Sequence, residues 1–265
     1  MHQLPAERSR SAVFSTLAIF LVAAAARSTL LIVAVDVPGD GPSRAFDAYQ
    51  WSQSPQWVSY GTWLPGLIYA GGVANMVVPN SVIAVRVLNA LAGALTASVV
   101  FAYVRQVYGS RTAWVAGLAI ALFPLHATLS ASSLSEPGFV LWVVLAEYVL
   151  VRASASWANM AIASVLALGL VVLAEMTRYE AWVLAPIFGA FLFFHSDRSW
   201  RSAAVVSTAL VAFPVLWCVG NAVYMGDTPS WASPWRVGAP FARSAPTCSG
   251  SAIVWRGSHA RRAIT

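Results

Sequence analysis

The sequence has few charged residues and very few cysteines. Asp, Glu, Lys and Arg make up 10% of its 265 residues, whereas hydrophobic residues make up 58%. This leaves too little polar surface to cover a soluble globular fold. The two cysteines, Cys218 and Cys248, have neither the density of a disulfide framework nor the spacing of metal ligands. The composition therefore predicts an integral membrane protein without an evident soluble domain.

Lysine is absent, and all sixteen basic residues are arginine. The net charge of +6 is not gathered in one patch, because the arginines stand at the ends of hydrophobic segments. This distribution argues against a nucleic-acid partner and indicates a membrane topology instead. The sequence also has no Gly-rich phosphate loop and no nucleophile elbow, so a nucleotide-driven mechanism has no support.

Seven segments are long and apolar enough to be predicted as membrane spans. They are residues 12–35, 81–104, 112–130, 137–152, 157–175, 180–195 and 202–222. The first is too long for the core of a signal peptide. The only long early connection, residues 36–80, is rich in Trp, Tyr, Gly and Pro, which predicts short interfacial helices. The predicted fold is an all-α, polytopic membrane helix bundle of about seven spans.

When the ends of successive segments are assigned alternately to the two membrane faces, most of the flanking arginines fall on one face and most acidic residues on the other. One face receives Arg8, Arg10, Arg105, Arg111, Arg152, Arg198 and Arg201. The other receives Asp36, Asp40, Asp47, Glu136, Glu175, Glu180 and Asp227. The positive-inside rule then predicts a multi-pass protein of the cell membrane with a cytoplasmic N-terminus.

The hydrophobic pattern ends after about Trp235, and the remaining residues show no period, span or turn signal. We therefore predict a helical membrane domain over residues 1–235 and an irregular tail over residues 236–265. Two interpretations of the tail are open: a chain that stops short with an end out of pattern, or a flexible terminal extension.

Three stretches place ionisable residues at the predicted outer face, where such residues often serve function. Asp47 lies in "RAFDAYQW", and it is either an exposed or helix-capping acid or a functional one. Glu136 lies in "SSLSEP", where Ser133 or Ser135 is a possible cap and Pro137 suits a first helical turn. A carboxylate at the start of a helix needs no chemistry to explain it.

The third stretch, "EMTRYEAW", joins two predicted spans with almost no loop. Glu175 and Arg178 are three residues apart and can pair, and Glu180 favours the start of the next helix. Local pairing does not explain why this face also receives the membrane-edge Arg86. Several acids and guanidinium groups around one cavity suit activation of a hydroxyl and binding of a phosphate leaving group.

The order of these stretches, with "GTWLPGLIYA" and "RVLNALAGALTASVVFAYVRQVYG" between them, resembles the N-terminal half of the GT-C membrane glycosyltransferases. The resemblance is to the dolichyl-phosphate-mannose protein mannosyltransferase-like group, glycosyltransferase family 39-like, over roughly residues 27–186. It implies an inverting enzyme that uses a polyprenyl-phosphate sugar at the outer face. It further implies a protein, lipid or glycan acceptor.

The same resemblance implies roles for five residues. Asp47 would be the general base, Arg86 and Arg178 would bind the donor phosphate, and Glu136 and Glu180 would contact sugar or acceptor. Ala48 follows Asp47 where many relatives have a second acid, so a paired-carboxylate mechanism is not implied.

Two other interpretations are open: an inactive membrane fragment of such an enzyme, and a small-solute transporter, against which the lack of repeated halves argues. No cofactor is evident besides the lipid-linked sugar substrate. No metal site is predicted, because His126 has no second His or Cys at ligand spacing. Metal dependence is left open, as are the sugar, acceptor and lipid carrier.

Overall fold

The computed structural model describes residues 5–36, 39–153, 157–195 and 200–225. These residues form ten α-helices and no strand, which confirms the predicted all-helical fold. The helices are α1 (Pro5–Val33), α2 (Asp40–Gln53), α3 (Pro65–Asn75), α4 (Ser81–Tyr108), α5 (Ser110–Leu122), α6 (Pro124–Ser130), α7 (Glu136–Ala153), α8 (Trp157–Glu175), α9 (Glu180–His195) and α10 (Trp200–Met225). The predicted tail, residues 236–265, lies outside the described residues.

Each predicted span corresponds to a helix or to a pair of helices, but fewer than seven meet the length and hydropathy of a membrane span. Within the described residues three do so: Ser11–Val33, Ser81–Tyr108 and Val206–Tyr224. The pair α5–α6, bent by 55°, adds a fourth. The structure thus supports an integral membrane protein with three or four spans. The prediction of about seven spans is not confirmed, because α7 carries three charged residues and the apolar parts of α8 and α9 are shorter.

The helix boundaries follow from local sequence. Pro65 and Pro124 occupy the first turn of α3 and α6, where a missing N–H costs nothing. The Asn80 side chain accepts a hydrogen bond of 3.0 Å from the Ile83 amide and caps α4. Gly109, with φ of 87°, separates α4 from α5. The long connection predicted to contain short helices does contain two, α2 and α3.

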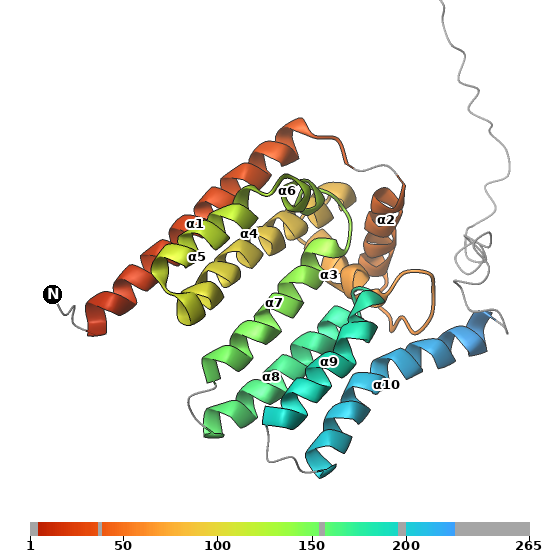
Figure 1. The fold of residues 1–265 in the computed structure, drawn as a ribbon. Coiled ribbons are helices and arrows are strands. Elements are labelled where there is room, and N and C mark those ends of the chain that lie inside the picture. Colours follow the sequence, from red (N-terminus) through yellow and green to blue (C-terminus); the bar gives the residue numbers. More distant parts are fainter. Residues whose placement is uncertain (1–4, 37–38, 154–156, 196–199, 226–265) are drawn as a thin grey trace, which may run out of the picture.

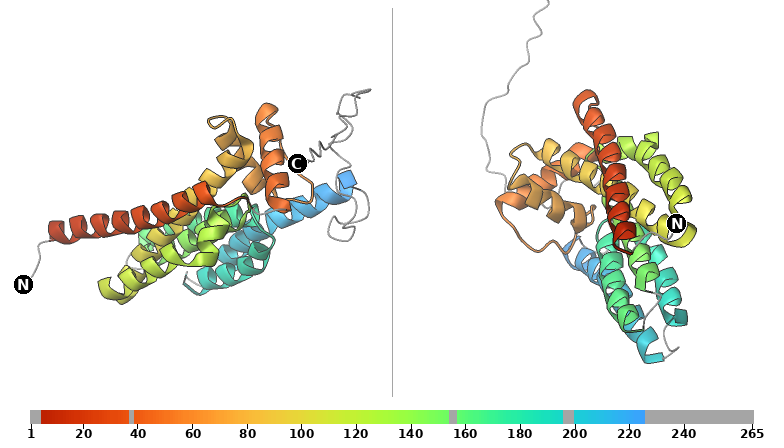
Figure 2. Two further views of the ribbon diagram at one scale, coloured as in Figure 1. Left: turned by 90° about the horizontal axis from the view of Figure 1, so that it is seen from above. Right: turned by 90° about the vertical axis from the view of Figure 1, so that its left-hand side faces the viewer.

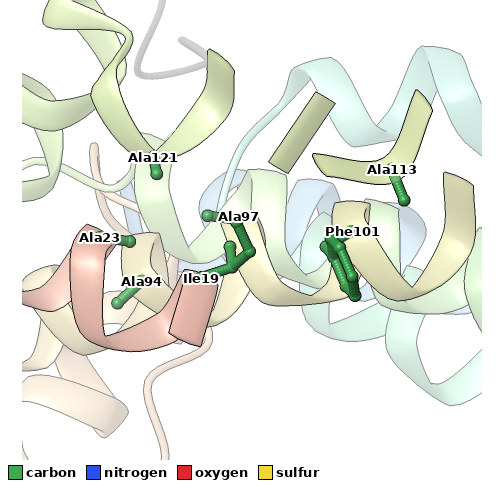
Figure 3. Close-up of a cluster of buried hydrophobic side chains, with 7 residues drawn as sticks. All are labelled: Ile19, Ala23, Ala94, Ala97, Phe101, Ala113 and Ala121. Carbon is green, nitrogen blue, oxygen red and sulfur yellow. The ribbon is translucent and has the colours of Figure 1, made fainter. Parts of the chain in front are cut away.

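Small residues form the contact between α1, α4 and α5 (Figure 3). The cluster consists of Ile19, Ala23, Ala94, Ala97, Phe101, Ala113 and Ala121. Alanine lets helix backbones approach closely, which is how helices associate in a lipid environment. A second cluster joins α7, α8, α9 and α10, and α4 packs against α7 between the two groups (Figures 1 and 2).

The fully buried Arg27 supports the bend between α5 and α6. Its Nη1 donates to the carbonyl oxygens of Ala23 and Ala121, both at 3.0 Å, and its Nη2 lies 2.7 Å from His126 Nδ1. The Ala121 carbonyl is available because α5 ends one residue later and leaves its last carbonyls without helical partners. Arg27 therefore belongs to the helix packing.

Gly93→Ala is expected to destabilise this region. A Cβ at position 93 would lie 2.1 Å from Ser130 Oγ and 2.6 Å from Arg27 Nε, so a buried polar side chain must move. We expect the free energy of unfolding to fall by about 1–3 kcal/mol, measured by thermal unfolding in detergent. Gly169→Ala is the matched control, since nothing lies within 4 Å of a Cβ there, and it should be neutral or slightly stabilising. Equal effects of the two substitutions would contradict the packing argument.

The two ends of the bundle are expected to face opposite sides of the membrane. Gly109 joins α4 to α5 at the end where α1 begins, whereas Ser133 joins α6 to α7 at the other end (Figure 1). Reporter fusions after Gly109 and after Ser133 should therefore give opposite locations, with Gly109 cytoplasmic. The same location for both fusions would contradict the predicted topology.

Candidate functional site

A small pocket lies where α2 and the following loop meet the start of α7 and the turn between α8 and α9. We call it the junction pocket. It is lined by Arg44, Trp63, Leu64, Ser135, Thr177, Arg178, Tyr179 and Glu180. Its volume of about 70 Å³ accommodates ordered water or one small polar group rather than a whole sugar.

Arg178 connects two helix starts at this pocket. Glu136 and Glu180 are the first residues of α7 and α9, where a carboxylate is favoured by the helix dipole. Arg178 Nη1 forms an ion pair with Glu136, and its Nε donates to Glu180 Oε2 at 3.0 Å. The bonds to Glu180 and, secondarily, the Glu136 carboxylate raise the pKa of the Arg178 guanidinium. The convergence predicted for these three residues is therefore present.

The two carboxylates that hold Arg178 differ in exposure. The Glu180 side chain is 57% exposed and that of Glu136 is 31% exposed. Exposed ion pairs contribute little to stability because water and salt compete with them. Glu180, which accepts hydrogen bonds from Arg178 Nε at 3.0 Å and Nη2 at 2.5 Å, is thus the more solvent-accessible of the two partners.

Arg44 is the second cation of the junction pocket, and the sequence motifs gave it no role. Its guanidinium lies 4.1 Å from the centroid of the Trp63 ring and donates to Ser135 Oγ, which stands immediately before α7. Asp40 stands one turn earlier on α2, and its Oδ2 lies 3.9 Å from Arg44 Nη2. Burial lowers the pKa of Arg44, and the carboxylates of Glu136 and Asp40 oppose that shift. An arginine keeps its charge under these conditions.

Asp47 lies on α2, close to one helical turn beyond Arg44, and the helical period places the two on the same side. Its side chain is half-buried, and this burial raises the pKa of the carboxyl. The described residues that line the junction pocket include neither Asp47 nor Arg86. Asp47 is therefore near the pocket along the helix but is not one of its walls.

Arg86 and Glu175 occupy other environments. Arg86 is buried, and it donates to the carbonyl oxygens of Ala131 at 2.6 Å and Ala34 at 2.7 Å, after the ends of α6 and α1. Glu175, fully buried, does not pair with Arg178, and neither of its carboxylate oxygens has a hydrogen-bond partner among the described residues. No cluster of three or more His, Cys, Asp or Glu suited to a metal occurs in the described part of the chain.

Comparison with known proteins assigns the chain to a protein family. Residues 65–220, more than half of the chain, match the family described as dolichyl-phosphate-mannose-protein mannosyltransferase. The chain therefore belongs to this family, and it is a membrane glycosyltransferase of the GT-C type. A search of curated proteins finds no match. The matched residues include Arg86, Glu136, Arg178 and Glu180, whereas Asp47 precedes them.

Proposed function

We propose that the protein transfers a sugar from a polyprenyl-phosphate donor to an acceptor hydroxyl at the outer face of the membrane, with inversion at the sugar carbon. Family membership supports the reaction class, and one observation supports the location. Arg178 and Arg44 line one pocket at a single end of the bundle, beside carboxylates from α7 and α9.

In the proposed reaction Asp47 takes the proton of the acceptor hydroxyl. The acceptor oxygen then bonds to the anomeric carbon from the side opposite the phosphate, and the bond from that carbon to the phosphate oxygen breaks. A half-buried carboxylate with a raised pKa is a better proton acceptor than an ordinary aspartate. The leaving polyprenyl phosphate carries away the electron pair and needs cationic partners.

We assign this phosphate to Arg178 and also to Arg44, because both line the junction pocket. Three carboxylates, Glu136, Glu180 and Asp40, lie beside these two cations and more than balance their charge. The donor phosphate binds when it replaces the exposed Glu180 on the Arg178 guanidinium, which frees Glu180 to contact the sugar or acceptor. Arg86 is left in a supporting position, since its Nε and Nη2 already donate to two backbone carbonyls.

The test is transfer of radiolabelled sugar from a polyprenyl-phosphate donor in membranes that contain the full chain. Label should enter the acceptor fraction with the lipid-linked donor and not with a nucleotide sugar. A folded, membrane-inserted protein without transfer from any polyprenyl-phosphate sugar would contradict the proposal and favour an inactive membrane protein of this family.

A further inference from the structure

The loop between α2 and α3 is held in place by α10 and by Tyr179. Four consecutive residues, 59–62, each contact α10 or Tyr179, and we call this segment the anchored loop. Figure 1 shows the connection from α2 to α3 reaching the C-terminal half of α10. The residues of this loop that follow, Trp63 and Leu64, line the junction pocket.

The closest contact is between Ser59 and Gly220. A Cβ at position 220 would lie 1.9 Å from the Ser59 carbonyl oxygen, so only glycine permits this approach. Next to it, the rings of Tyr60 and Tyr224 stack with their centroids 4.7 Å apart. Tyr179 Oη donates to the Thr62 carbonyl at 3.2 Å and accepts from Trp217 Nε1 at 3.3 Å.

The directional contact is between Gly61 and Asn221. Asn221 is buried, and its Nδ2 donates to the Trp217 carbonyl at 3.0 Å, which turns its Oδ1 toward the loop. That oxygen accepts a hydrogen bond of 3.0 Å from the Gly61 amide. Gly61 has a φ of 141°, a conformation that side-chain-bearing residues rarely adopt. The bond therefore fixes the backbone two residues before Trp63.

We infer that Asn221 is a positioning residue of the junction pocket, which holds Gly61 so that the Trp63 ring stays against the Arg44 guanidinium. An arginine over an aromatic ring keeps its orientation through the cation–π contact. The consequence for binding rests on the proposed function: Asn221, which touches no reacting group, sets how well Arg44 meets the donor phosphate.

Asn221→Leu tests this inference with one readout that needs no ligand. Tyr60→Cys and Tyr224→Cys are introduced into the full chain with Cys218→Ser and Cys248→Ser, and a short bismaleimide joins the two new thiols. Loss of one buried hydrogen bond should lower the equilibrium constant between the anchored and the detached loop about fivefold, and the cross-linking rate should fall by up to that factor. Asn221→Asp, which burial keeps protonated, offers an O–H to the Trp217 carbonyl and an oxygen to the Gly61 amide, and it should restore the rate to within about twofold.

Asn75→Leu is the matched control. Asn75 is also a buried helical asparagine whose Nδ2 donates to a carbonyl four residues back, Gly71, at 2.9 Å. Its Oδ1 has no partner among the described residues. The control should therefore leave the cross-linking rate unchanged, and an equal slowing in both leucine variants would overturn the inference.

The second readout is kinetic and uses a polyprenyl-phosphate sugar as the probe, with native cysteines and tyrosines in place. Asn221→Leu should raise KM for the donor about fivefold and change kcat by less than about twofold, with rescue by Asn221→Asp. Slower cross-linking with an unchanged KM would overturn the positioning role. Slower cross-linking in a protein whose native form transfers no sugar would support the position of the loop and contradict the proposed function.

Discussion

Asp47→Asn is expected to reduce the rate of sugar transfer by about a hundredfold or more at matched protein abundance. The substitution keeps the shape of a half-buried side chain and removes the carboxylate that the proposed mechanism uses as the base. General-base catalysis usually supplies a factor of this size. Donor KM should change little, because the proposed base contacts the acceptor rather than the phosphate.

The pH dependence of transfer gives a second measure of Asp47. The base must be ionised, so the rate should rise with pH through the pKa of Asp47 and level off above it. Burial raises that pKa, so the rise should lie above the pH range of an ordinary aspartate. Asp47→Asn should remove the rise together with most of the rate.

Asp40→Asn is the matched control on the same helix. Asp40 is 59% exposed, and the 3.9 Å between its Oδ2 and Arg44 Nη2 is long for an ion pair. Its substitution should therefore reduce the transfer rate by less than about threefold. If Asp47→Asn retained nearly full transfer at equal abundance, Asp47 would be an ordinary acid of α2 and the base would have to be sought elsewhere.

Arg178→Ala is expected to abolish measurable transfer and also to weaken the fold. The substitution removes the guanidinium from the donor phosphate, where it acts in ground and transition states alike, so KM should rise and kcat should fall. It also leaves Glu136 and Glu180 without their shared cation, and because both carboxylates are partly exposed, the free energy of unfolding should fall by no more than about 1 kcal/mol.

A triple variant separates these two effects. Arg178→Ala combined with Glu136→Gln and Glu180→Gln removes the repulsion between the two acids and should recover the thermal stability lost in the single variant. Transfer should stay absent, because no neutral side chain replaces the guanidinium at the phosphate. If the triple variant regained both stability and transfer, Arg178 would be a structural residue alone.

Much of the helical part of the fold could be predicted from local sequence. Hydropathy, Pro65, Pro124, Asn80 and Gly109 act within a few residues, and the helices begin and end close to where these signals place them. The number of spans was less predictable. A charged helix such as α7, packed among others, does not meet the length and hydropathy that mark a span by itself.

The proximity of Glu136, Arg178 and Glu180 could be predicted because it depends on where two helices start. Glu136 and Glu180 each open a helix, so their placement at one end of the bundle followed from counting spans, and Arg178 stands two residues before Glu180. Arg44 was not singled out because its contact is with Trp63, which lies in an irregular loop without any period. The backbone partners of Arg86 could not be predicted either, because every residue has a carbonyl and the sequence does not show which one a side chain contacts.

Gly61 and Asn221 are separated by 160 residues, which bears on how the protein is made. At synthesis rates of about 5–20 residues per second, roughly 10–30 s pass between their emergence from the ribosome. During that time α2, α3 and the loop between them are already translated while their support on α10 does not exist. Assembly of the junction pocket is therefore a late event, and a nascent chain arrested before residue 221 would contain Arg44 and Trp63 without the contact that holds them together.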